Sequence, residues 1–237
     1  MVSEVVAPST RSFWSPTRQR DALVVVLTVV TGSVDAIGLL RLGGVFTSVM
    51  TGNMVLLGIA MGKHDASIAI HTGVAFLAYV LGSFLGARVA GHPEKSEHLW
   101  PRPVVNALIV ELGIMAVFGV WWEVVGAAPS TGVEYALLSL NAVALGVQSS
   151  AVLRFGISGL STTYLTGTLT QFIAGLTKRG AALQVRSALI LLALIGGAAA
   201  GASAALYAPR LAPAVPLAAL LTVVGGAWYS FHRRSTN

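Results

Sequence analysis

The chain has 237 residues, of which 55% are hydrophobic and only 10% are charged. A soluble domain carries about a quarter charged residues, and no soluble core can absorb this much apolar sequence, so the composition excludes a soluble globular protein and predicts lipid-facing helices. The absence of cysteine excludes disulfides, thiol catalysis and cysteine-based metal sites. We attribute the net charge of +6 to basic residues on the cytoplasmic side of a membrane, not to nucleic-acid binding.

The first 20 residues, with three arginines, are predicted to be a cytoplasmic tail. They are not interpreted as a signal peptide, because the apolar stretch after them continues past signal-peptide length. Eight apolar segments follow, each about the 20 residues that a membrane-crossing helix needs. They are Ala22–Leu40, Leu42–Gly62, Ala66–Ala90, Val104–Trp122, Tyr135–Leu153, Phe155–Leu176, Ala181–Tyr207 and Leu211–Phe231.

Segment length alone allows eight crossings, but the distribution of lysine and arginine favours six. Eight crossings with the N-terminus inside leave nine basic residues in the cytoplasm and six outside. If Leu42–Gly62 and Phe155–Leu176 instead enter and return on the same side, the counts become twelve and three. The positive-inside rule therefore predicts an all-α membrane protein with six spans, two re-entrant or broken segments, and both termini in the cytoplasm.

The chain contains an internal duplication. Asp35 matches Gln148 at an offset of 113 residues, and Thr47 matches Thr162 at an offset of 115. The longer offset continues to Gly82-x-x-x-Gly86 and Gly197-x-x-x-Gly201, which we interpret as helix-packing positions. Three crossings per half make the second copy enter from the opposite face, which predicts a 3+3 inverted repeat. The repeats are placed at residues 21–125 and 135–231, with an outer loop at 126–134 and a cytoplasmic tail at 232–237.

The stretches from Val34 to Ala36 and from Gly43 to Asn53 resemble the YoaK-like family of small bacterial integral membrane proteins. The second half resembles it at Gly146–Gln148 and from Ser161 to Leu169. The resemblance implies about six transmembrane helices in a bacterial inner membrane, and no established activity. Family members often have Asn after this Gln, where the chain has Ser149, so the resemblance implies that an amide of the polar site is missing here.

Two carboxylates within apolar segments, Asp35 and Glu111, are candidates for proton coupling, because an acid near mid-membrane is costly and usually faces a cavity or a partner. Asp35 lies on one helical face with Thr28 and Gly32, and Gln148 is related in the same way to Asn141. The alternatives are a salt bridge from Asp35 to Arg41 or Arg154, and a hydrogen bond from Glu111 to a neighbouring helix.

The two Thr-Gly segments are candidates for solute binding. Glycine among hydroxyl and amide side chains allows a helix to open, and the positive ends of half-helices favour anions. The alternative is close helix packing with the hydroxyls bonded back to their own helix. The predicted binding residues are Thr47, Ser48, Thr51, Gly52, Asn53, Thr162, Thr163, Thr166, Gly167, Thr168, Gln148, Asn141, Arg41 and Arg154. The two arginines either attract an anionic solute or anchor helix ends by snorkelling.

The sequence offers no residues for an enzyme. The five histidines form no metal-ligand cluster, and no phosphate loop, zinc motif or nucleophile elbow is present, so no cofactor, metal or nucleic acid is expected. We expect a secondary transporter of a small polar or anionic solute, with the lipid bilayer as partner and a homo-oligomer left open. The alternatives are a channel and a membrane scaffold protein without transport.

Overall fold

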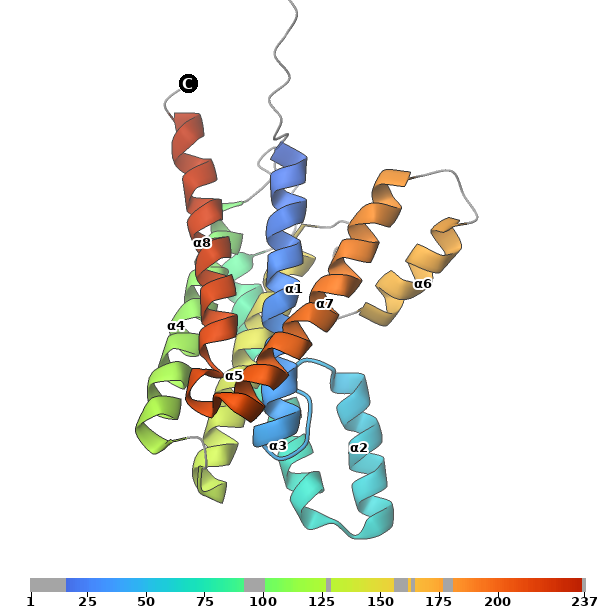
Figure 1. The fold of residues 1–237 in the computed structure, drawn as a ribbon, viewed down its shortest axis with the longest axis vertical. Coiled ribbons are helices and arrows are strands. Elements are labelled where there is room, and N and C mark those ends of the chain that lie inside the picture. Colours follow the sequence, from blue (N-terminus) through green and yellow to red (C-terminus); the bar gives the residue numbers. More distant parts are fainter. Residues whose placement is uncertain are drawn as a thin grey trace, which may run out of the picture.

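The computed structural model describes residues 16–91, 101–126, 129–155, 162, 165–176 and 181–235. Within these residues the chain is helical (Figure 1). Its helices are α1 (Pro16–Arg41), α2 (Met50–Lys63), α3 (Ala66–Ala90), α4 (Arg102–Val125), α5 (Thr131–Leu153), α6 (Leu165–Leu176), α7 (Ala181–Tyr207), the short 3-10 helix η1 (Pro209–Leu211) and α8 (Ala214–Ser235).

Six of the described helices, α1, α3, α4, α5, α7 and α8, are long and apolar enough to cross a membrane, which confirms the predicted all-α fold with six spans. The two Thr-Gly segments form the remaining helices, α2 with 14 residues and α6 with 12. At a rise of 1.5 Å per residue these are about 21 Å and 18 Å long, too short for a hydrocarbon core of about 30 Å. In Figure 1, α2 lies near the lower end of the bundle and α6 near the upper end.

The turn between α1 and α2 depends on two glycines. Gly43 and Gly44 have φ angles of 83° and 72°, in the left-handed region that favours glycine. The Leu42 amide bonds back to the Gly38 carbonyl at 3.1 Å, which ends α1 before this turn. The chain reverses within a few residues, so that Thr47 and Ser48 return to the side of α1 before α2 begins.

Helices α1 and α5 form the centre of the bundle. In the most apolar window of each, 72% of α1 and 67% of α5 is buried, against 28% for α3 and 22% for α7. Helix α1 packs most extensively against α7, and α3 against α5. Helices α4 and α8 pack against each other and against α5 and α1 respectively. The helices α1, α5, α4 and α8 therefore enclose a common interior, called the four-helix interior below.

In the two most extensive interfaces, α3 with α5 and α1 with α7, glycines allow the helix backbones to contact each other directly. A Cβ on Gly82 of α3 would lie 2.1 Å from the Val143 carbonyl oxygen of α5. A Cβ on Gly197 of α7 would lie 2.4 Å from the Val29 carbonyl oxygen of α1. No side chain fits at either position, so these glycines let the helix backbones touch. This confirms the packing role predicted for the Gly-x-x-x-Gly pairs.

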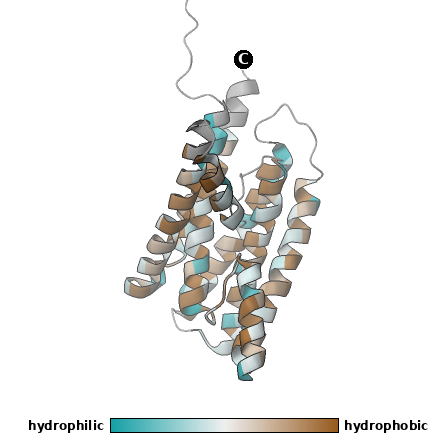
Figure 2. Ribbon diagram, turned by 90° about the vertical axis from the view of Figure 1, so that its right-hand side faces the viewer, coloured by the Kyte–Doolittle hydropathy of each residue, from teal (hydrophilic) through white to brown (hydrophobic). Residues whose placement is uncertain are grey.

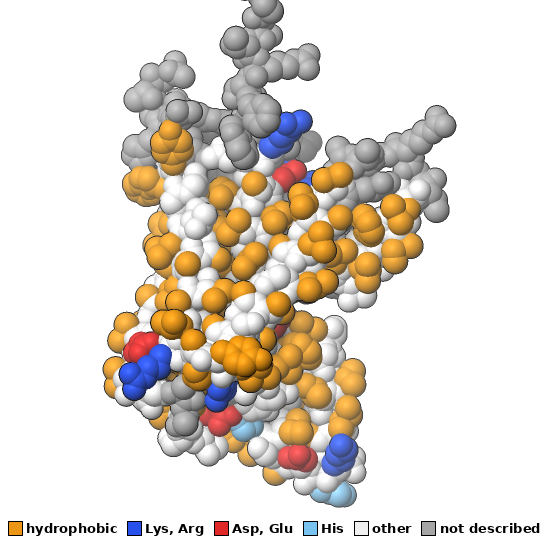
Figure 3. Space-filling view, in the orientation of Figure 1, with side chains coloured by type: hydrophobic (Ala, Val, Ile, Leu, Met, Phe, Trp, Pro, Cys, Tyr) orange, Lys and Arg blue, Asp and Glu red, His pale blue; other side chains and the backbone are white. Residues whose placement is uncertain are grey.

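The outer flanks of the bundle are apolar. Large hydrophobic side chains are exposed along α3 and α7, including Leu77, Leu81, Leu192 and Ile195. Apolar residues run along the length of the helices in Figure 2, and in Figure 3 the charged side chains of the visible face lie near its two ends. An exposed apolar band between charged ends is the surface that a lipid bilayer requires.

Candidate functional site

Asp35 binds the turn that precedes α2. Its Oδ1 accepts hydrogen bonds from the Thr47 amide (2.8 Å), the Thr47 hydroxyl (2.8 Å) and the Ser48 amide (2.9 Å). Its Oδ2 accepts a fourth from the Ser48 hydroxyl at 2.5 Å. Hydrogen bonds to a carboxylate are short and strong, so this one side chain fixes the re-entrant turn to α1. The donors are amides and hydroxyls of the turn and not the arginines considered as alternatives.

Gln148 makes the corresponding contact in the second half. Its Nε2 lies 2.9 Å from the hydroxyl of Thr162 and 2.9 Å from that of Thr31 on α1, with the Leu27 carbonyl at 3.3 Å. An amide nitrogen has two hydrogens and satisfies two of these three acceptors at a time. The sequence pairs Asp35 with Gln148 and Thr47 with Thr162. In the structure Asp35 bonds to Thr47, and Gln148 bonds to Thr162.

Asp35 and Gln148 lie close to the same stretch of α1. Thr31, which bonds to Gln148, is one helical turn before Asp35 and therefore on the same face. The structure thus brings together Asp35, Thr47 and Ser48 from the first half with Gln148 and Thr162 from the second. We call these residues, with Thr31, the crossing cluster; all six are buried.

Asn53 and Thr168, the last residues of the predicted Thr-Gly motifs, are both buried but differ in bonding. Asn53 brackets the backbone of Phe46, accepting from its amide at 3.0 Å and donating to its carbonyl at 2.7 Å. The Thr168 hydroxyl has no hydrogen-bond partner in the part of the chain that the structure describes. Asn53 therefore has a structural role in holding the turn, whereas Thr168 keeps a hydroxyl available inside the protein.

Other predicted binding residues lie outside the crossing cluster. Thr51 and Thr166 are exposed on the short helices, and Gly52 and Gly167 are half-buried beside them. A Cβ on Gly52 would lie 3.3 Å from the ring of Phe46. Thr163 lies outside the described residues. The structure therefore assigns the buried bonds to the residues just before α2 and α6, while the Thr-Gly dipeptides face outward.

The two predicted arginines lie at helix ends. Arg41 donates from Nε (3.1 Å) and Nη2 (2.6 Å) to the Ala205 carbonyl near the end of α7. This is a helix C-terminus anchored by a cation. Arg154, at the end of α5, has its Nη1 2.7 Å from where a Cβ on Gly91 would stand, next to the end of α3. Each arginine thus lies beside the C-terminus of the helix that packs against its own helix. This position agrees with the alternative that the two arginines anchor helix ends.

Glu111 is buried in the four-helix interior without a partner. It belongs to the apolar face of α4 that includes Leu108, Met115, Phe118 and Trp122. Glu111 is 0% exposed, and neither carboxyl oxygen has a hydrogen-bond partner among the described residues. The hydrogen bond to a neighbouring helix, considered as its alternative, is therefore not formed in this structure. A buried carboxyl without a partner is costly, and such groups mark functional sites.

Asn141 is the second unpartnered group. It is 0% exposed on α5, the helix that packs against α4, and neither its Oδ1 nor its Nδ2 has a partner. The predicted match of Asn141 is Thr28, whose hydroxyl donates to the Val24 carbonyl at 3.0 Å. The Gln148 carbonyl oxygen is also unpartnered. The interior therefore has unfilled hydrogen-bonding capacity on α4 and α5.

One buried polar contact was not predicted from the sequence. His71, on α3, is 4% exposed, with Nδ1 2.8 Å from the Ser67 carbonyl and Nε2 3.3 Å from Glu134 Oε1. Its ring fills the space beside Gly43, where a Cβ would lie 2.0 Å from Cδ2. The sequence pattern predicted no role for His71; the available signal was its position six residues into an apolar segment.

Ser149, the departure from the family pattern, accepts a hydrogen bond from the Tyr79 hydroxyl at 2.8 Å. Its side chain therefore takes part in the interface between α3 and α5. The Asn expected at this position from the resemblance would stand in the same interface.

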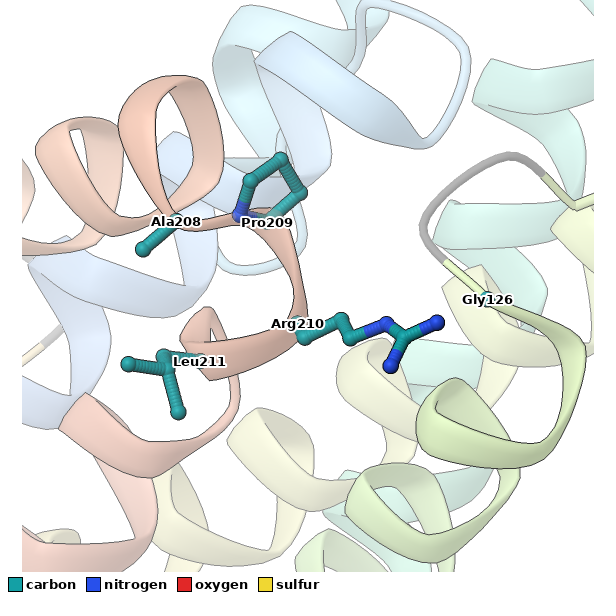
Figure 4. A pocket seen from close by; sticks show the side chains of 5 residues that line it. All are labelled: Gly126, Ala208, Pro209, Arg210 and Leu211. Atoms are coloured by element: carbon teal, nitrogen blue, oxygen red, sulfur yellow. The ribbon is translucent and has the colours of Figure 1, made fainter.

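A hollow between the end of α4 and η1 is lined by Gly126, Ala208, Pro209, Arg210 and Leu211, with Arg210 extending towards Gly126 (Figure 4). Gly126 is 15 residues beyond Glu111, about 22 Å along a helix. This hollow is therefore at the end of the bundle and separate from the buried polar groups.

Comparisons with known proteins agree with the resemblance. A family model described as a protein of unknown function, DUF1275, matches residues 23–226. The UPF0700 transmembrane protein YoaK of Bacillus subtilis (strain 168) is 35% identical over 160 residues, which are 68% of this chain and 68% of that protein. No solved structure matches the chain. The family match and the six apolar helices together show that the chain is a multi-pass membrane protein that belongs to the DUF1275 (YoaK-like) family.

Proposed function

We propose that this protein is a secondary transporter of a small polar solute, whose site lies between the crossing cluster and the four-helix interior. The observation that carries the proposal is Glu111, a fully buried carboxyl with both oxygens unpartnered at the centre of a membrane protein. A protein that served only as a scaffold would gain nothing from a costly unpaired acid there. A transporter needs such a group to bind a solute or a proton.

We further propose that the halves form an inverted repeat. In this repeat α1 corresponds to α5, α3 to α7 and α4 to α8. The contacts between the halves agree with that correspondence: α1 packs against α7 as α5 packs against α3, and α1 packs against α8 as α5 packs against α4. The details of the first pair also match, since Gly32 meets Leu194 and Ala198 while Gly146 meets Tyr79 and Ser83. Leu194 and Ala198 lie 115 residues after Tyr79 and Ser83, and Gly146 lies 114 residues after Gly32. Inverted repeats around a central site are the usual architecture of secondary transporters.

The short helices support a site at mid-membrane. Helices that end inside the membrane leave backbone amides to be satisfied by protein or solute. In the first half these are the Thr47 and Ser48 amides, which Asp35 satisfies. We therefore assign Asp35 to holding the turn and Glu111 to proton coupling, because only Glu111 lacks partners that compete for its oxygens.

The protein is proposed to reside in the bacterial inner membrane with both termini in the cytoplasm. The twelve-to-three distribution of lysine and arginine supports this orientation. The start of α1 and the end of α8 also lie towards the same end of the bundle in Figure 1, as an even number of crossings requires.

Reconstitution into liposomes tests the transport function. Purified protein is sealed into vesicles with internal pyranine, a pH-sensitive dye, and guanidinium, methylammonium, glycerol and sulfate are added in turn. A transporter gives solute-dependent proton movement that Glu111→Gln abolishes, while Glu123→Gln, at an exposed position on the same helix, keeps wild-type flux. Step-like currents in a planar bilayer would instead indicate the channel. Folded protein without flux for any of these solutes would favour the scaffold.

A further inference from the structure

The unpartnered atoms of the site are mostly hydrogen-bond acceptors. They comprise both Glu111 carboxyl oxygens and the side-chain carbonyl oxygens of Asn141 and Gln148. The unpartnered donors of the same region are the Asn141 amide and the Thr168 hydroxyl. The Arg154 Nε, which also has no hydrogen-bond partner among the described residues, belongs to a residue at the end of α5. A ligand that completes the central set must therefore donate more hydrogen bonds than it accepts.

The charged side chains within the membrane interior are negative, so they also favour a ligand that is positively charged. The central parts of the spanning helices, at 22–40, 67–87, 103–122, 135–153, 187–206 and 212–229, contain Asp35 and Glu111 but no lysine or arginine. Asp35 is compensated by four hydrogen bonds from the turn. Glu111 has no such compensation, so the interior has an unmet demand for positive charge.

The features that would attract an anion are already occupied or distant. The Thr47 and Ser48 amides, in the turn before α2, bind Asp35. Arg41 donates to the Ala205 carbonyl. Arg154 lies six residues beyond Gln148, about 9 Å further along the helix. An anionic solute in the interior would meet Glu111 without a counter-charge.

We propose that the solute is a small cation that donates hydrogen bonds, of the alkylammonium or guanidinium class, and that Glu111 is its counter-ion. Asn141 and Gln148 supply neutral carbonyl oxygens that accept its remaining hydrogens. This inference rests on the proposed transport function and names the solute class of the same site. It replaces the anionic solute considered from the sequence.

Carbodiimide labelling tests the inference without measuring transport. The full-length protein in liposomes is treated with dicyclohexylcarbodiimide, which modifies carboxyls in apolar surroundings, and the peptide containing Glu111 is quantified by mass spectrometry. Guanidinium at twice its dissociation constant occupies two thirds of the sites and lowers labelling of Glu111 about threefold. Equal concentrations of sulfate and glycerol leave labelling unchanged. Glu111→Gln removes the signal and verifies its assignment, and Glu123 serves as an internal control that no solute protects.

The outcomes separate the inference from the function on which it rests. Protection by guanidinium or methylammonium without any flux supports the solute class and contradicts transport. Flux of sulfate, or protection by sulfate alone, supports transport and overturns the cationic solute. A Glu111 that the carbodiimide does not label overturns the inference, because a counter-ion must be reachable by its ligand.

Discussion

The two halves hold a matched threonine with opposite chemistry, through a carboxylate acceptor for Thr47 and an amide donor for Thr162. In the first half a carboxylate on α1 accepts four hydrogen bonds from the turn. In the second half an amide on α5 donates to the hydroxyl of Thr162 and to Thr31. At the matched positions of Asp35 and Gln148, the protein therefore needs a side chain that hydrogen-bonds to the threonine, but this side chain need not be charged. The half with the carboxylate is tied more strongly, since hydrogen bonds to a charged group contribute about twice as much as neutral ones.

Removing the carboxylate is expected to give the largest effect. Asp35→Ala leaves the Thr47 and Ser48 amides buried without acceptors, and we expect a loss of about 3 kcal/mol or more of stability. Thermal unfolding of the purified protein in detergent measures the change, with the exposed Glu123→Ala as a control. An Asp35→Ala protein as stable as the wild type would mean that the turn is held by other contacts.

Glycine replacements compare the two halves at their main interfaces. Gly82→Ala and Gly197→Ala each place a methyl group against a backbone carbonyl, and we expect each to lose about 1–3 kcal/mol, by similar amounts. Gly196→Ala is the matched control, because nothing lies within 4 Å of its Cβ position. Its stability should stay the same or rise, since alanine favours a helix. A large loss in only one half would show that the duplicated interfaces are not equivalent.

Gln148→Leu addresses the weaker tie. It removes the donor to the Thr31 and Thr162 hydroxyls but leaves no buried backbone amide without a partner, so we expect a loss of about 1–2 kcal/mol. The same unfolding assay compares it directly with Asp35→Ala. The comparison between the halves fails if the Gln148 variant is the less stable of the two.

The smallest effect is expected at Gly44. Gly44→Ala meets no neighbour within 4 Å, so only its φ angle of 72° opposes the substitution, at about 1 kcal/mol. Gly43→Ala has a similar φ angle and in addition collides with the His71 ring, so it should be clearly less stable. Equal unfolding temperatures for the two variants would show that the ring moves aside without cost.

Much of this arrangement was predictable because lipid constrains sequence so strongly. Six apolar helices, and the burial of Asp35 and Glu111 inside the bundle, follow from where polar residues are tolerated in a membrane. The pairing of Thr47 with Thr162 was also visible as a repeat. The sequence did not reveal that these threonines bond to Asp35 and Gln148. For Thr47, the turn that returns it to α1 depends on the left-handed conformation of Gly43 and Gly44, which the residue pattern does not specify.

The sequence also could not predict which faces of the short helices α2 and α6 point into the protein. Thr51 and Thr166 were expected at the site because they flank glycines in both halves, yet both are exposed. Which side of each short helix faces inward depends on its packing against α3 or α7, and the sequence alone does not give that packing. His71 was missed because its partner Glu134 is 63 residues away, at the start of another helix.

The bond from Arg41 to the Ala205 carbonyl bears on how α1 and α7 can move. At Gly32, Gly197 and Gly201 these helices meet through glycine and backbone. The guanidinium pins them together near the C-termini of both. Any tilt of α7 against α1 must therefore pivot at that fastened end, and its displacement grows towards the opposite face of the membrane.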